Sequence, residues 1–168
     1  MTAKASSRQL LTPRRTSPFN LMQERYRSDP WALLVGCILF NMVRGKKAQP
    51  IHEKFLNRWP GPLNLWWVNP EEKSGVIVEM VDMFKTLGFQ NRRAQRVWKM
   101  TEDFLLLRPD VHADVDIEEL HGIGKYGADS FNIFCRGILI EDARDKELRR
   151  YVEWAFGQGA GRVLQKDP

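Results

Sequence analysis

Two stretches of the sequence hold residue types that could do chemistry, and the first is LHGIGKYGAD at residues 120–129. In it Gly122 and Gly124 flank one apolar residue, and Lys125 follows directly. Since glycine has no Cβ and tolerates positive φ, such a hairpin lets the backbone approach a ligand closely. Residues 126–135 form a helical pattern, and the free N–H groups at a helix start typically face a phosphate. The same spacing also fits a plain turn between two packed helices.

The second stretch is ARDKELRRY at residues 143–151, in which Asp145 lies at the apparent start of the last helix. A carboxylate beside a helix N-terminus is favoured in its ionised form. There Asp145 could polarise a water molecule. It could also offset positive charge that develops on a substrate, as carboxylates do in glycoside hydrolysis. An aspartate in this place is also a common N-cap, worth about 1 kcal/mol of stability.

The rest of the sequence predicts helices that would position these two stretches. Asp29-Pro30 is an N-cap followed by proline at N1, and apolar residues recur at helical spacing from Trp31 to Leu39. The other predicted helical segments are residues 17–26, 45–59, 76–87, 94–105, 114–120, 126–135 and 148–156. Nothing convincing alternates with period two, so we predict an all-α fold of about nine or ten helices with few strands or none.

The composition is that of one globular domain. The chain has 168 residues, of which 43% are apolar, enough for a proper core. No apolar run approaches the ~20 residues of a membrane span, so we expect no membrane partner. The cysteines, Cys37 and Cys135, are too few for a disulfide framework and are predicted to be buried thiols. With three histidines and two cysteines, widely spaced, no metal site is predicted.

Positive charge gathers at the N-terminus. Residues 1–16 hold four basic residues and no acid, which is +4 of the net charge of +5. We predict a disordered basic tail there, which could be a DNA arm, a targeting signal or a solvated terminus. A nucleic-acid footprint elsewhere must be a local patch. The candidate phosphate contacts are Arg44, Lys46, Lys47, Arg92, Arg93 and Arg96, with ordinary solvated charge as the alternative for each.

Several segments, in order along the chain, resemble one protein family. The hairpin Leu-x-Gly-x-Gly-Lys-Tyr, with Asp145 some twenty residues beyond it, resembles the helix-hairpin-helix DNA glycosylase superfamily. Within it, the chain is most similar to the glycosylase domain of the methyl-CpG-binding, mismatch-specific thymine/uracil glycosylases. This resemblance covers residues 17–156. It rests also on residues 17–24, Asp29-Pro30-Trp31, Leu87-Gly88, Arg93-Ala94, and on Leu148, Tyr151 and Trp154.

The resemblance implies a fold and an activity. The fold is a two-lobed helical domain at residues 17–168, with the hairpin motif at about 115–135 and the active site in the cleft between the lobes. The activity is hydrolysis of the N-glycosidic bond of thymine or uracil mispaired with guanine, after base flipping, with Asp145 as the catalytic carboxylate. Bifunctional members carry a nucleophilic lysine where Tyr126 stands, so a monofunctional enzyme without lyase activity is implied. No cofactor is implied, although a monovalent cation at the hairpin is left open.

The resemblance also assigns a pocket for the flipped pyrimidine. Gln23 and Tyr126 would line it, with Phe40 and Met22 beside the base. The amide of Gln23 offers both a donor and an acceptor to a pyrimidine edge. From the residues alone, an exposed helix glutamine is the preferred interpretation of Gln23, and Tyr126 could simply pack against the hairpin.

Three positions depart from the family pattern. Met42 stands where the family has a minor-groove arginine, and Phe89 where it has a second wedge, a leucine. Large apolar side chains can still wedge between bases. Glu147 replaces a family lysine. The complete set of predicted DNA-binding residues is Met42, Arg44, Gly45, Lys46, Phe89, His121, Gly122, Gly124, Lys125 and Gly127.

The expected partner is double-stranded DNA with a mismatched or damaged base, bound by a monomer in the nucleus. Two alternatives stay open. The first is a non-enzymatic helix-hairpin-helix module that binds DNA and has no need of Asp145. The second is a glycosylase for another damaged base, which the pocket residues would decide.

Overall fold

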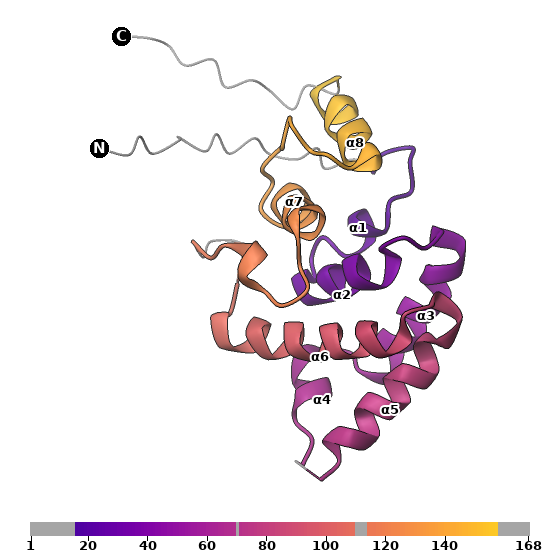
Figure 1. The fold of residues 1–168 in the computed structure, drawn as a ribbon. Helices are drawn as coiled ribbons and strands as arrows, with labels where there is room; N and C mark the ends of the chain where they lie inside the picture. Colours follow the sequence, from indigo (N-terminus) through magenta and orange to yellow (C-terminus); the bar gives the residue numbers. More distant parts are fainter. Residues whose placement is uncertain (1–15, 70, 110–113, 158–168) are drawn as a thin grey trace.

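The computed structural model describes residues 16–69, 71–109 and 114–157. Within these ranges the chain forms eight α-helices, two short 3-10 helices and no strand, so the predicted all-α fold is confirmed (Figure 1). The elements are α1 (Met22–Arg25), α2 (Pro30–Phe40), α3 (Gly45–Arg58), α4 (Pro62–Trp66), α5 (Lys73–Phe84), η1 (Lys85–Leu87), α6 (Gln90–Leu107), η2 (Ile117–Glu119), α7 (Lys125–Phe134) and α8 (Lys146–Gly157). The predicted nine or ten helices slightly exceed the number of α-helices found.

Helix α2 is the centre of the fold. Its start is fixed as predicted, because the Asp29 carboxylate accepts a hydrogen bond from the Ala32 N–H at 3.0 Å and Pro30 occupies the first helical position. Every residue from Trp31 to Leu39 is buried. A helix that is apolar all round must be packed on all sides. Accordingly, α2 contacts α1, α3, α6 and α7, and Figure 1 shows it between α7 and α6.

The other helices form two groups on either side of α2. One group is built on the long helix α6, which packs against α4 and α5, while α3 packs against α5. The other group holds α1, η2 and α7, which contact one another through α7. Helix α8 joins this second group through aromatic contacts, such as Phe134 with Tyr151 at a centroid distance of 4.5 Å. The hairpin at residues 120–124 therefore lies where the two groups meet.

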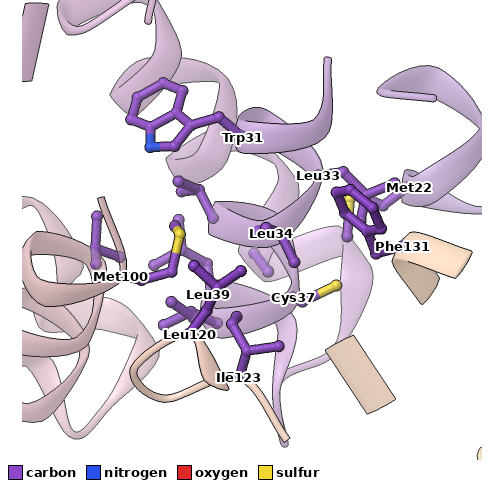
Figure 2. Packing of buried hydrophobic residues seen from close by; sticks show 14 of the residues in the cluster. Met22, Trp31, Leu33, Leu34, Cys37, Leu39, Met100, Leu120, Ile123 and Phe131 are labelled. Carbon is purple, nitrogen blue, oxygen red and sulfur yellow. The ribbon is translucent and has the colours of Figure 1, made fainter. Parts of the chain in front are cut away.

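Apolar residues of the hairpin anchor it to the core. Leu120 and Ile123 are buried, and Figure 2 shows them beside Leu39 and Cys37 of α2. The polar and glycine positions between them stay at the surface. Burial of the two apolar side chains thus holds the hairpin in place while leaving its backbone open to a ligand.

The prediction of a helix over residues 17–26 is wrong in its extent, because α1 spans only Met22–Arg25. The buried Glu24 carboxylate holds the preceding segment in a turn. It accepts hydrogen bonds from Ser17 N–H (2.7 Å), Ser17 Oγ–H (2.8 Å) and Leu21 N–H (3.3 Å). The side chain thereby supplies the partner that a helix backbone would otherwise provide.

Smaller differences occur elsewhere. The segment predicted as a helix at 114–120 is the 3-10 turn η2, and the short helix α4 after Pro60-Gly61 was not predicted. Cys37 is buried as expected, whereas Cys135 is only half-buried. The predicted basic tail, residues 1–16, lies outside the described residues except for Thr16. No helix in the described ranges is long and apolar enough to cross a membrane.

Candidate active site

The hairpin presents two glycines in different conformations. Gly122 has a φ of +78°, so only glycine adopts it without strain. Gly124 is extended, with φ −104° and ψ −170°, and a Cβ there would meet no protein atom within 4 Å. Gly124 is also the N-cap of α7 and has no side chain to satisfy the first N–H groups of that helix. These N–H groups are therefore available to an acceptor that approaches from outside.

Helix α6 packs against the hairpin through Arg96 and Asp103. A Cβ on Gly122 would lie 2.9 Å from Cγ of Arg96, so the arginine stem packs directly on this glycine. The backbone N–H of His121 donates to Oδ2 of Asp103 at 2.7 Å, while the His121 side chain is exposed. Gly127 is buried, and a Cβ there would lie 2.8 Å from Cγ2 of Ile123. Gly127, in the first turn of α7, is therefore required for close packing against Ile123 of the hairpin.

A cavity of about 260 Å³ opens between the C-terminal end of α2 and the hairpin, and we call it the hairpin cavity. Its lining is Cys37, Ile38, Asn41, Arg96 and residues 122–127. Both groups of helices contribute to the lining, as the predicted cleft between two lobes requires. Tyr126 is the one aromatic residue in this lining.

Gln23 and Tyr126, predicted to share a site, are in direct contact. The Gln23 amide nitrogen donates to the Tyr126 hydroxyl oxygen at 2.8 Å and to Ser130 Oγ at 3.3 Å. Gln23 is buried rather than exposed. Its carbonyl oxygen Oε1 accepts no hydrogen bond from the described residues, so this acceptor is left for a ligand.

Asp145 combines a cap with a free oxygen. Its Oδ1 accepts hydrogen bonds from the backbone N–H groups of Glu147 (2.9 Å) and Leu148 (3.0 Å) at the start of α8. Its Oδ2 has no hydrogen-bond partner in the described part of the chain. The side chain is half-buried. The capping interpretation and the chemical one are therefore compatible, since each needs a different oxygen.

Electrostatics link Asp145 to Tyr126 and Cys37. Burial, more than any other cause, raises the pKa of the Tyr126 phenol well above its ordinary value and that of the Cys37 thiol to about 12. The negative charge of Asp145 raises both pKa values further, so Asp145 lies within electrostatic range of the phenol and the thiol. At neutral pH the phenol and the thiol are thus uncharged. Cys37 consequently lacks the thiolate that a nucleophile needs.

Lys125 is engaged within its own helix. Its Nζ lies 3.0 Å from Oδ1 of the buried Asp129, one turn further along α7. The ammonium group is partly exposed at the rim of the hairpin cavity. It can meet a phosphate there, and the ion pair with Asp129 holds the side chain along α7.

Met22 and Phe40 do not line the hairpin cavity. Met22 is buried between α1 and α2, where its Sδ would lie 2.5 Å from a Cβ on Gly36. The Phe40 ring packs edge-on against His52 at a centroid distance of 5.9 Å. The structure therefore brings Gln23 into contact with Tyr126, with Asp145 within electrostatic range of Tyr126, although Gln23 and Asp145 do not line the hairpin cavity either. Met22 and Phe40 lie around His52.

The two predicted wedges are exposed on neighbouring turns. Met42 is 92% exposed and Phe89 68% exposed, and both have a left-handed backbone, with φ of 57° and 51°. The guanidinium of Arg92 lies over the Phe89 ring at 5.8 Å. Arg44, Gly45 and Lys46, at the start of α3, are exposed beside Met42 in the chain, and so is Glu147 in α8.

Known proteins with similar sequences include the following three. The methyl-CpG-binding domain protein 4-like protein of Arabidopsis thaliana is 31% identical over 121 residues, 72% of this chain and 24% of that protein. The thymine/uracil-DNA glycosylase of Pyrobaculum aerophilum is 29% identical over 135 residues, 79% of this chain and 55% of that protein. The thymine-DNA glycosylase of Aeropyrum pernix is 24% identical over 161 residues, 86% of this chain and 69% of that protein.

The chain is a relative of known DNA glycosylases. Its expected resemblance to the helix-hairpin-helix glycosylase superfamily is confirmed. The solved structure of a thermostable thymine-DNA glycosylase has the same fold, with a TM-score of 0.58 at 20% identity over 76% of this chain and 54% of that one. No family model matches the sequence. The chain spans about a quarter of the length of the Arabidopsis relative and about half of the Pyrobaculum one.

Some residues of this glycosylase-like site were not predicted. Cys37 and Asn41 line the hairpin cavity, and Ser130 accepts a hydrogen bond from Gln23. Their spacing could have indicated them. Ser130 lies four residues after Tyr126, and Asn41 lies four residues after Cys37, so the members of each pair share one helix face. Among the described residues no group of three His, Cys, Asp or Glu side chains could hold a metal ion. The hairpin cation and the nuclear location stay predictions.

Proposed function

We propose that this chain is a monofunctional DNA N-glycosylase that releases thymine or uracil mispaired with guanine and leaves an abasic site. The observation that carries the proposal is the contact of Gln23 with Tyr126, with Asp145 within electrostatic range of the phenol, beside a hairpin whose glycine backbone is exposed. Relatives of the chain are named thymine/uracil-DNA and thymine-DNA glycosylases, which supports the same class of substrate. A binding module would gain nothing from a carboxylate oxygen left without a partner.

The reaction breaks one bond and forms another. The C1′–N1 bond cleaves and its electron pair leaves with the base, while positive charge develops on the deoxyribose. Oδ2 of Asp145 faces this charge and stabilises it, as carboxylates do in glycoside hydrolysis. Water then adds its oxygen to C1′ and gives up a proton, which Asp145 accepts or passes to solvent. The cap through Oδ1 holds the carboxylate still during these steps.

The base is held by neutral polar groups. The free Oε1 of Gln23 can accept the N3–H of thymine or uracil. The donors of the same amide are fixed by Tyr126 and Ser130, so the acceptor points in one direction. Because burial keeps Tyr126 protonated, no second negative charge opposes a departing base that carries one. A departing anion beside a neutral phenol is easier to form than one beside a phenolate.

The arrangement of the amines supports a monofunctional reaction without lyase chemistry. Schiff-base formation needs an unprotonated amine aimed at C1′. At the position where bifunctional relatives have lysine this chain has Tyr126, and the neighbouring Lys125 is paired with Asp129. The product is therefore an abasic site in an intact strand.

Duplex DNA would approach across the hairpin and the two wedge turns. The first N–H groups of α7 and the Lys125 ammonium suit a phosphate, while Met42 and Phe89 are placed to enter the base stack. These residues belong to one chain, so a monomer suffices.

The experiment is a panel of duplexes that each hold one U:G, T:G, U:A or 8-oxoguanine pair, followed by alkali to cut at abasic sites. We expect product from U:G and T:G, with much less from U:A, because a mismatched base costs less to flip. Product from 8-oxoguanine alone would assign a different lesion. Binding without product on every duplex would instead identify a DNA-binding module.

A further inference from the structure

Arg93 is a buried cation whose donors all point at main-chain carbonyls. The side chain extends from α6 and the residue is only 6% exposed. Its Nε donates to the Gly88 carbonyl at 2.9 Å, and its Nη2 to the Asn41 carbonyl at 2.9 Å. Its Nη1 donates to the carbonyls of Ile38 and, at 3.4 Å, Leu39. The sequence predicted a phosphate contact here, but these donors are already used and the residue is buried.

The carbonyls come from two segments that are far apart in the sequence. Three belong to the C-terminal end of α2, where the last carbonyls of a helix have no partner within it and carry the negative end of its dipole. The fourth is Gly88, in the turn before α6. No carboxylate pairs with Arg93 among the described residues. One rigid, planar guanidinium therefore links the two segments.

Each segment continues directly into an exposed apolar residue in a left-handed conformation. Met42 follows Asn41, and Phe89 follows Gly88. A left-handed backbone is unfavourable for residues with a side chain and persists only where the surroundings impose it. Here the carbonyl immediately before each of the two residues is held by the same side chain.

We propose that Arg93 is a positioning residue that fixes the separation and direction of Met42 and Phe89, so that the two side chains enter the DNA stack together. This inference rests on the proposed function, because a wedge has a use only when a base is flipped. It goes beyond that function by assigning the preorganisation of both wedges to one residue that does not touch DNA. Lysine could replace it only in part, since an ammonium group lacks the planar fork that reaches both segments at once.

The first test measures hydrogen exchange of the backbone in Arg93→Met and Arg93→Lys. Residues 41–44 and 88–90 should both exchange faster in Arg93→Met, with a smaller effect in Arg93→Lys, while α7 is unchanged. Arg58→Met is the matched control, since it removes an exposed arginine that pairs with the Glu79 side chain and not with a main-chain carbonyl. Faster exchange in only one turn, or in neither, would overturn the link between them.

The second test measures single-turnover uracil excision from a U:G duplex and from single-stranded DNA. Arg93→Met should slow the duplex reaction about tenfold and the single-stranded reaction by less than about threefold. In a Met42→Ala, Phe89→Ala background the same substitution should change the duplex rate by less than about threefold, because no wedge is left to position. A general loss of stability would lower all of these rates alike, and that result would overturn the proposal. If the wild-type protein released uracil from neither substrate, the proposed function and the wedge role would fail together. Hydrogen exchange would still show whether Arg93 links the turn at residues 41–44 to the turn at residues 88–90.

Discussion

Replacement of Met42 by alanine separates a DNA wedge from a structural residue. Because Met42 is 92% exposed, truncation removes almost no buried surface from the protein itself. Its stability should therefore change by less than about 0.5 kcal/mol. In the complex, however, a methionine inserted between bases becomes buried, and such burial is worth roughly 1.5–3 kcal/mol. The rate of excision from a T:G duplex should then fall about 10- to 150-fold if that energy is used to hold the gap open.

The assay is a single-turnover comparison of a T:G duplex with single-stranded DNA that contains uracil. The single-stranded substrate has no partner base to displace, so its rate should be nearly unaffected by Met42→Ala. Leu106→Ala is the control, since Leu106 is 76% exposed and lies at the opposite end of α6 from Phe89. Equal losses on paired and unpaired substrates would refute the wedge and give Met42 a structural role.

Three further predictions concern the hairpin, the chemistry and the response to acid. Gly124→Val should weaken binding to any duplex without loss of stability, because the φ of Gly124 is ordinary and no protein atom lies near its Cβ position. Gly122→Val should also destabilise the fold, because Gly122 has a positive φ. Equal duplex affinity of Gly124→Val and wild type would contradict a close approach of DNA to this glycine. Borohydride should trap no covalent adduct with an abasic-site precursor, and a trapped adduct would show that Lys125 or another amine does attack. Burial lowers the pKa of His52 to about 4. Below pH ~6.5 the unfolded chain therefore binds a proton on His52 that the folded chain does not bind until about pH 4. The free energy of unfolding should consequently fall by about 3 kcal/mol between pH 6.5 and 4. Urea titrations of His52→Gln should lack this part of the acid loss, and an unchanged pH profile would refute it.

The sequence predicted those elements whose causes are local. The Asp29-Pro30 start of α2 and the place of Asp145 at the start of α8 depend on residues a few positions apart, and both are found as expected. The hairpin turn likewise needs only Gly122 and its buried neighbours. These features are readable because each is determined within one or two turns of chain.

Features that depend on distant contacts were not predicted. The length of α1 is decided by the Glu24 carboxylate, which replaces helix bonds with bonds to Ser17 and Leu21. Arginine is usually a surface residue, but Arg93 is buried against the C-terminal end of α2, more than fifty positions earlier in the chain. Ser130 became part of the site only when α1 packed against α7 and brought Gln23 to it. Each depends on tertiary packing, which spacing alone does not encode.

The most direct test of the account is base release by Asp145→Asn. Asparagine keeps an oxygen that can cap α8 through Glu147 and Leu148, so the fold and the affinity for undamaged duplex should be retained. Only the charge beside the sugar is lost. Single-turnover excision of uracil from a U:G duplex should therefore fall by about a hundredfold or more. Full activity in Asp145→Asn would contradict the central claim that this carboxylate stabilises the positive charge on the deoxyribose as the base departs.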